Sequence, residues 1–122
     1  MFSFTLLDLV EEMLPEVHKL ISEKGFDLDV VVTEWLSRLF VGWLPYQVTL
    51  RVMDSFLFEG REMLFKTALA FLNRALPLIQ NAEGQREFNQ ALRASIGPES
   101  DIDAFMESVF EFRVKRSKVE GL

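Results

Sequence analysis

The sequence contains no cysteine, which excludes disulfide bonds and thiolate metal sites. Its single histidine, His18, cannot by itself form a familiar zinc site or a Cys–His catalytic pair. We interpret His18 as a partly exposed helix residue. The glycines are scattered and form no G-x-x-x-x-G-K-[ST] phosphate loop. The residues alone therefore indicate no enzyme: we expect no catalytic residue, no bound metal and no cofactor.

Long apolar runs and an excess of positive charge are also missing. No run of about 18 apolar residues is free of charges, so we expect no integral membrane segment. The first residues have no cationic start and soon become acidic, which argues against a secretory signal. A net charge of −6 argues against binding to nucleic-acid phosphates, or by charge to anionic lipid. We expect a cytoplasmic protein that binds no nucleic acid and reaches membranes only through its partners.

What the chain does have is apolar material at helical spacing. Its 122 residues are 49% hydrophobic and include twelve phenylalanines, which is enough for one hydrophobic core. No stretch of useful length alternates with the period of two that is typical of strands. We predict an all-α fold, a compact bundle of about six or seven helices. The whole chain, residues 1–122, is expected to form a single helical domain.

Capping and breaking residues predict where these helices begin and end. Pro15 begins the second helix and Gly25 ends it, and Asp29 is the expected cap of the third. Pro77 should cause a kink or an end near Leu76. Asp101 is the expected cap of a last helix, whose end the basic residues 113–118 would stabilise. The expected helices cover about residues 4–14, 15–24, 29–43, 45–59, 64–79, 83–95 and 101–114.

The stretch from Pro45 to Gly60 carries the clearest punctuation. Pro45 suits a first helical position, and Gly60 suits the left-handed position just past a helix end. Asp54 lies within the apolar field of this helix, so we expect it to need a partner against the cost of desolvation. A local pair with Arg51, or hydrogen bonds from a neighbouring helix, would supply that partner. The predicted inward stripe consists of Val48, Val52, Met53, Phe56 and Leu57.

Four segments in order resemble the C-terminal half of the TBC domain, which is found in GTPase-activating proteins for Rab GTPases. They read LPEVHKL at 14–20, WLSRLFVGWLP at 35–45, RVMDSFLFEG at 51–60 and LFKTALAFL at 64–72. The resemblance covers roughly residues 4–80, and residues 81–122 would add further C-terminal helices. Met53 stands where the family usually has tryptophan. The matching motif residues, which we expect to be structural, are Trp35, Phe40, Pro45, Arg51, Asp54, Glu59 and Gly60.

The resemblance implies a partner, a Rab GTPase bound through the complete domain, but not activity of this chain alone. TBC proteins use an arginine finger from I-x-x-D-x-x-R and a glutamine finger from Y-x-Q, both in the N-terminal half. No arginine precedes Arg38 here, and Tyr46-Gln47 lacks the intervening residue. We expect a lobe that supports fold and GTPase binding but is inactive alone. The alternative is a non-catalytic helical interaction module derived from a TBC domain.

The expected lobe would expose the apolar face that normally meets the missing N-terminal lobe. Monomers rarely leave a large apolar patch bare. We therefore expect the isolated chain to self-associate, or to rearrange its first or last helix over that face.

Overall fold

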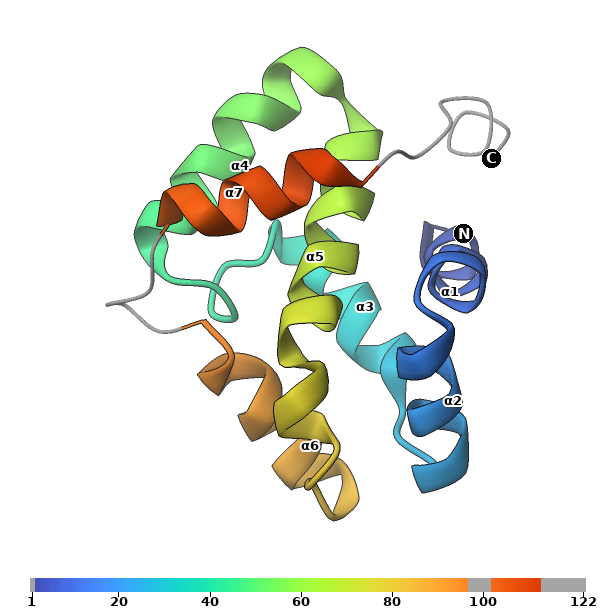
Figure 1. Cartoon of the computed structure of the whole chain (residues 1–122). Helices are drawn as coiled ribbons and strands as arrows, with labels where there is room; N and C mark the ends of the chain where they lie inside the picture. Colours follow the sequence, from blue (N-terminus) through green and yellow to red (C-terminus); the bar gives the residue numbers. More distant parts are fainter. Residues whose placement is uncertain (1, 97–101, 113–122) are drawn as a thin grey trace.

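Helix α5 (Arg61–Ile79) runs through the middle of the structure, and the other helices pack around it (Figure 1). The computed structural model describes residues 2–96 and 102–112, with side chains described from Leu6 onward. Within these residues there are seven α-helices and no strand, so the prediction of an all-α bundle is confirmed. All seven helices contribute to one continuous hydrophobic core.

The middle of α5 is buried on every side. Residues 67–72 are all buried in succession, which a helix with one polar face does not allow. Thr67 is the polar exception, and its hydroxyl donates a hydrogen bond to the carbonyl of Met63 at 2.8 Å. The helix therefore acts as the centre of the core, and α2, α3, α4, α6 and α7 all pack against it.

Three helices form the N-terminal part of the structure: α1 (Phe2–Met13), α2 (Pro15–Lys24) and α3 (Leu28–Arg38). Pro15 is the first residue of α2, and Gly25 ends it with a left-handed φ of 70°, both as predicted. The cap of α3 is Asp27, not Asp29. The Asp27 carboxylate accepts a hydrogen bond from the N–H of Val30 at 3.2 Å, so α3 begins at Leu28, two residues earlier than a cap at Asp29 requires.

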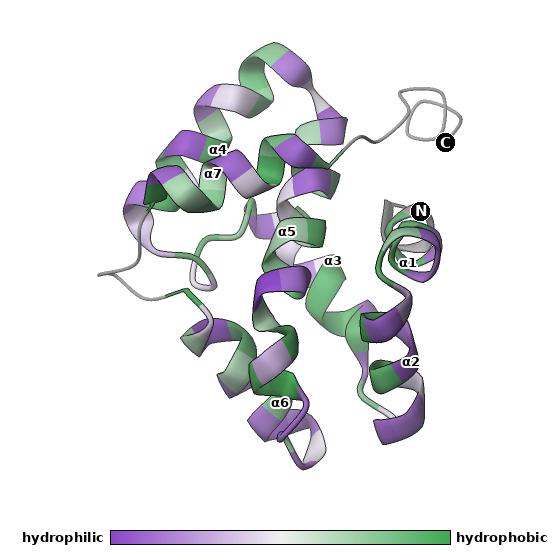
Figure 2. Ribbon diagram, in the orientation of Figure 1, coloured by the Kyte–Doolittle hydropathy of each residue, from purple (hydrophilic) through white to green (hydrophobic). Residues whose placement is uncertain are grey.

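The remaining helices are α4 (Tyr46–Glu59), α6 (Gly84–Ala94) and α7 (Ile102–Glu111). Helix α7 lies beside α4 although more than forty residues separate them in sequence (Figure 1). Helix α6 combines hydrophobic and hydrophilic positions (Figure 2) and turns Phe88 and Leu92 into the core. The Lys24 ammonium donates hydrogen bonds to the carbonyls of Gln80 and Ala82, which fastens α2 to the end of α5.

Two predicted helix ends differ from the structure. The third helix stops at Arg38 and not at Trp43, because Leu39 and Phe40 adopt positive φ angles and turn the chain. Of the two alternatives predicted at Pro77, a kink or an end near Leu76, the end is wrong, because the fifth helix continues through Pro77 to Ile79. Asp101, Val114 and the basic residues 113–118 lie outside the described residues. In the described part of the chain, no helix is both long and apolar enough to cross a bilayer.

Replacing Phe71 with alanine should lower the free energy of unfolding by about 3–5 kcal/mol, because the ring is fully buried and leaves a cavity. Urea denaturation followed by circular dichroism measures this change. The matched control is Phe58→Ala, since Phe58 is 89% exposed and its removal should change stability by no more than about 0.5 kcal/mol. Equal losses for both variants would contradict the placement of α5 at the centre of the core.

Candidate functional site

Trp35 is the centre of an aromatic cluster that joins α3 to α5. Its indole stacks on Phe71 with ring centroids 4.8 Å apart and an interplanar angle of 17°. Phe40 lies 5.6 Å away, and Trp43 contacts the indole edge-on at 5.9 Å. All four rings are buried, and such pairs stabilise by about 0.5–1.5 kcal/mol beyond the area they bury. The structure therefore brings two of the motif residues, Trp35 and Phe40, together in the core.

Packing of this cluster explains an unusual turn after α3. Leu39 and Phe40 have φ angles of 52° and 67°, a left-handed conformation that costs roughly 1–2 kcal/mol per residue outside glycine. Two backbone hydrogen bonds close the turn. The N–H of Phe40 donates to the carbonyl of Trp35, and the N–H of Trp43 donates to the carbonyl of Phe40. It directs both aromatic rings back onto α3, and their burial offsets the backbone cost.

Helix α6 contacts the same turn, at residues 39–45, through Arg93. The Arg93 guanidinium lies 3.8 Å from the centroid of the Trp43 ring, which is a cation–π contact. Its Nε also donates a hydrogen bond to the carbonyl of Gly42 at 3.3 Å. The turn at residues 39–45 is thus fixed on one side by the core and on the other by α6.

Pro45 and Gly60 flank the two ends of α4. Pro45 was predicted at the first helical position but lies just before it, and its carbonyl accepts a hydrogen bond from the N–H of Thr49. Gly60 has φ 76° and ψ −153°, a region that is essentially restricted to glycine, and not the left-handed helical region expected from the sequence. It is also the single residue between α4 and α5, so it sets the corner between them.

The charged motif residues lie apart from one another on the surface. The Arg51 guanidinium pairs with Asp103 of α7 at 2.8 Å, and Glu59 pairs with Lys66 of α5 at 3.8 Å. Asp54 is exposed, and its carboxylate forms no hydrogen bond or ion pair with another described residue. The expected local pair with Arg51 is therefore absent from the described part of the chain. Because Asp54 is exposed to solvent, the desolvation cost that predicted a partner does not arise.

The outward side of α4 is a bare apolar surface. Tyr46, Leu50 and Leu57 are exposed and Met53 partly so, with exposed fractions of 76% at Tyr46 and 79% at Leu57. At about 3.6 residues per turn, these four positions fall within roughly 60° of arc. Together with Val41 they form what we call the α4 apolar face. A groove of about 380 Å³ opens on it between Val41, Tyr46, Leu50 and Met53.

An exposed apolar face was predicted from the sequence but not its place on α4, and one residue was assigned to the wrong side. Leu57 was expected to point inward, but it is exposed; Val48 and Val52 are buried as predicted. The signal for the second stripe was present, since Tyr46, Leu50, Met53 and Leu57 are spaced by four, three and four. Helix α4 thus carries two apolar stripes, and α5 and α7 cover only one of them.

Among the described residues, no group of three or more histidine, aspartate or glutamate side chains could hold a metal ion. His18 is partly buried on α2, in agreement with its interpretation as a helix residue. The arrangement around α4 offers a surface for contact, with Asp54 and Phe58 beside it.

Comparison with known proteins matches residues 2–79 to a family model described as the Rab-GTPase-TBC domain. The chain is 32% identical to TBC1 domain family member 10A of Mus musculus, covering 94% of this chain and 24% of that protein. It is 30% identical to growth hormone-regulated TBC protein 1 of Xenopus laevis, covering 84% of this chain and 31% of that protein. With Rab GTPase-activating protein eat-17 of Caenorhabditis elegans the identity is 27%, covering 94% of this chain and 13% of that protein.

The chain therefore spans less than a third of the length of each of these three relatives. No solved structure matches it.

Replacing Gly60 with alanine should lower the free energy of unfolding by about 1–3 kcal/mol, because alanine is strained at φ 76° and ψ −153°. A Cβ at Gly60 would meet no atom within 4 Å, so the loss would come from backbone strain and not from a clash. Thermal and urea unfolding measure it.

The control on the same helix is Asp54→Ala. Since Asp54 is exposed and unpaired with any described residue, its replacement should change stability by no more than about 0.5 kcal/mol. A large loss in this variant would restore a structural role for Asp54.

Proposed function

The chain belongs to the Rab-GTPase-TBC domain family, and we propose that it acts as the C-terminal lobe of a GTPase-activating domain for a Rab GTPase. In this role it supports the fold of the complete domain and contributes part of the surface that binds the GTPase. The motif residues serve the lobe itself: Trp35 and Phe40 build its core, and Pro45 and Gly60 set the ends of α4. The protein would work in the cytoplasm and reach membranes through its partners.

The observation that carries this proposal is the α4 apolar face. An exposed side chain such as Leu57 or Tyr46 is unremarkable alone, but a contiguous apolar stripe beside a groove marks a contact surface. The helix that presents it is fixed by the family motif at both ends. We infer that the N-terminal half of a TBC domain packs on this face.

Catalysis would depend on that other half. The sequence contains neither I-x-x-D-x-x-R nor Y-x-Q, so it supplies no arginine finger or glutamine finger. An arginine finger contributes about 10³–10⁵ in rate by stabilising charge on the transferring phosphoryl group. This corresponds to roughly 4–7 kcal/mol of transition-state stabilisation.

A second function uses the same face. Because the α4 apolar face is formed without any other chain, it could bind a helix of a different protein through the groove beside Leu50. The chain would then be a non-catalytic interaction module derived from a TBC domain. Complementation by a TBC N-terminal half distinguishes the two functions.

The chain alone should not accelerate GTP hydrolysis by a Rab GTPase, but adding the N-terminal half of a TBC domain from a relative should restore acceleration. The expected gain is up to about 10³–10⁵ over the intrinsic rate, because the added half supplies both fingers. Single-turnover phosphate release, measured with a panel of Rab GTPases, reports the rate.

The N-terminal half alone and the same half with its finger arginine replaced by alanine are the controls. Acceleration by the chain without any added half would contradict the proposal. Binding of the two halves without acceleration of any Rab would favour the interaction module.

The α4 apolar face should also make the isolated chain self-associate, since burying Leu57 and Tyr46 removes apolar area from water. Leu57→Lys should shift the chain toward monomer in sedimentation velocity and prevent binding of the N-terminal half. Leu78→Lys is the matched control, because Leu78 is exposed on α5 outside this face. A wild-type chain that stays monomeric at all concentrations would count against self-association through α4.

A further inference from the structure

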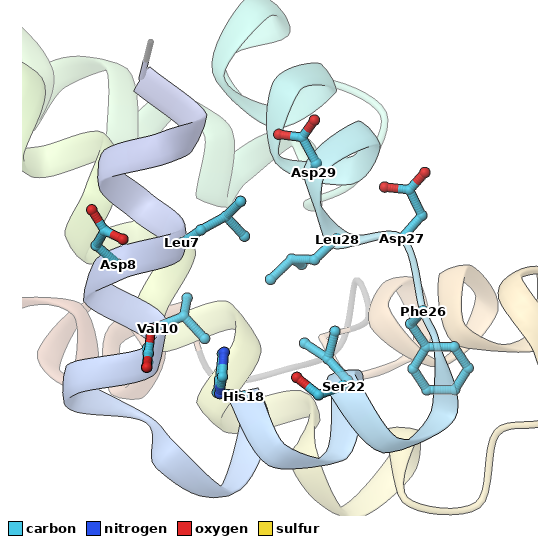
Figure 3. A pocket seen from close by; sticks show the side chains of 11 residues that line it. Leu7, Asp8, Val10, His18, Ser22, Phe26, Asp27, Leu28 and Asp29 are labelled. Carbon is cyan, nitrogen blue, oxygen red and sulfur yellow. The ribbon is translucent and has the colours of Figure 1, made fainter.

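A second cavity, separate from the groove on α4, lies in the N-terminal part of the chain between α1, α2 and the start of α3 (Figure 3). Its volume is about 310 Å³, at the lower end of the range of about 300–1,000 Å³ for ligand pockets. We call it the α1–α3 pocket. Figure 3 shows Leu7 of α1 and Leu28 of α3 pointing toward one another, with His18 of α2 pointing into the space below them. The apolar side chains of its wall are Leu7, Val10, Ile21, Phe26 and Leu28.

The rim of this pocket carries negative charge only. Four carboxylates line it, Asp8 and Glu11 from α1 with Asp27 and Asp29 from the start of α3, and no lysine or arginine does. None of the four forms an ion pair with another described residue. Figure 3 shows Asp27 and Asp29 pointing away from the middle of the pocket, so the charge surrounds an apolar interior.

Helix capping accounts for only half of this charge. Asp27 caps α3 and Asp29 lies in its first turn, where negative charge is favourable. Glu11 lies in the last turn of α1, where the helix dipole disfavours a carboxylate, and Asp8 lies one turn before it. Two unneutralised carboxylates beside an apolar cavity therefore serve neither the helix nor an ion pair of the described chain.

The part of the rim at the start of α3 is held in place by hydrogen bonds to α6. The side-chain oxygen of Gln85 accepts a hydrogen bond from the N–H of Asp27 at 2.7 Å, and its amide nitrogen donates to the Asp27 carbonyl at 3.3 Å. Since Gln85 belongs to α6, the start of α3 is fixed to a helix outside the pocket. A ligand would meet a rim that is already ordered and would lose little entropy in ordering it.

We propose that the α1–α3 pocket binds a peptide segment of a partner protein in which lysine or arginine residues flank one bulky apolar side chain. The apolar side chain fills the space between Leu7 and Leu28, and the flanking cations pair with Asp8 and Glu11 on one side and with Asp27 and Asp29 on the other. Charge complementarity selects a basic segment, and the pocket selects the apolar residue. The site is separate from the α4 apolar face, so its failure would leave the proposed Rab function unaffected.

The test uses the full chain and a fluorescein-labelled peptide of sequence Gly-Lys-Arg-Leu-Lys-Arg-Gly. Fluorescence anisotropy should show binding that weakens as salt is raised, because exposed charges are screened. Amide chemical shifts in two-dimensional NMR should change at Leu7, His18 and Leu28. Peptides with glutamine in place of the basic residues, or glycine in place of leucine, should bind much more weakly.

Asp8→Asn combined with Glu11→Gln should weaken binding by about fivefold to tenfold, as expected for the loss of two exposed ion pairs. Ser22→Trp, a change at an exposed position on the pocket wall, should block entry of the leucine side chain and abolish the chemical-shift changes. Both variants keep the buried wall intact, and circular dichroism verifies their folding.

The matched control is Asp54→Asn combined with Glu107→Gln, which removes the same charge from exposed positions on α4 and α7. It should bind like the wild-type chain. An equal loss in this control would show attraction to the net negative charge alone and overturn the proposal. Unchanged binding by the Asp8/Glu11 variant or by Ser22→Trp would overturn it as well.

Discussion

The contact between Trp35 and Phe71 is the constraint on which the rest of the structure depends. It joins α3 to the central helix α5, and the left-handed turn at Leu39 and Phe40 adds the rings of Phe40 and Trp43 to the same cluster. The turn in turn decides where α4 begins. A local backbone cost at two residues is thus offset by aromatic burial, and the position of the helix that carries the exposed face follows from it.

Helix α4 combines two tasks that usually fall to different elements. One side packs on α5 and α7 through Val48 and Val52, and ion pairs from Arg51 and Glu59 tie it to both neighbours. Another side leaves Leu57 and Tyr46 uncovered. The family motif accounts for the first task, since its residues form the core, the helix ends and the ties. The second task is encoded by residues between the motif positions.

Much of the fold could be predicted from the sequence because its determinants are local. The preference for glycine after a helix predicted the helix ends at Gly25 and Gly60, and the preference for proline at a helix start predicted the start at Pro15. Helical spacing predicted Val48 and Val52 on the buried side of α4. The errors arose where tertiary packing decides. Whether Leu57 points inward depends on which side α5 and α7 approach, and Trp43 leaves the third helix because its ring fits beside Trp35. The sequence alone does not tell which of the two apolar stripes of α4 is buried, because that depends on the neighbouring helices. For the same reason Asp54 was expected to need a partner.

Gly60 has a mechanical consequence for any partner of α4. Because one residue alone separates α4 from α5, the two helices cannot change their relative angle without moving that residue out of a conformation open almost only to glycine. The Glu59–Lys66 pair spans the same corner. The angle between α4 and α5 is therefore fixed, and Gly60 does not act as a hinge. A binding partner meets a surface whose orientation is set in advance, and a movement imposed on α4 would be transmitted directly to the centre of the lobe.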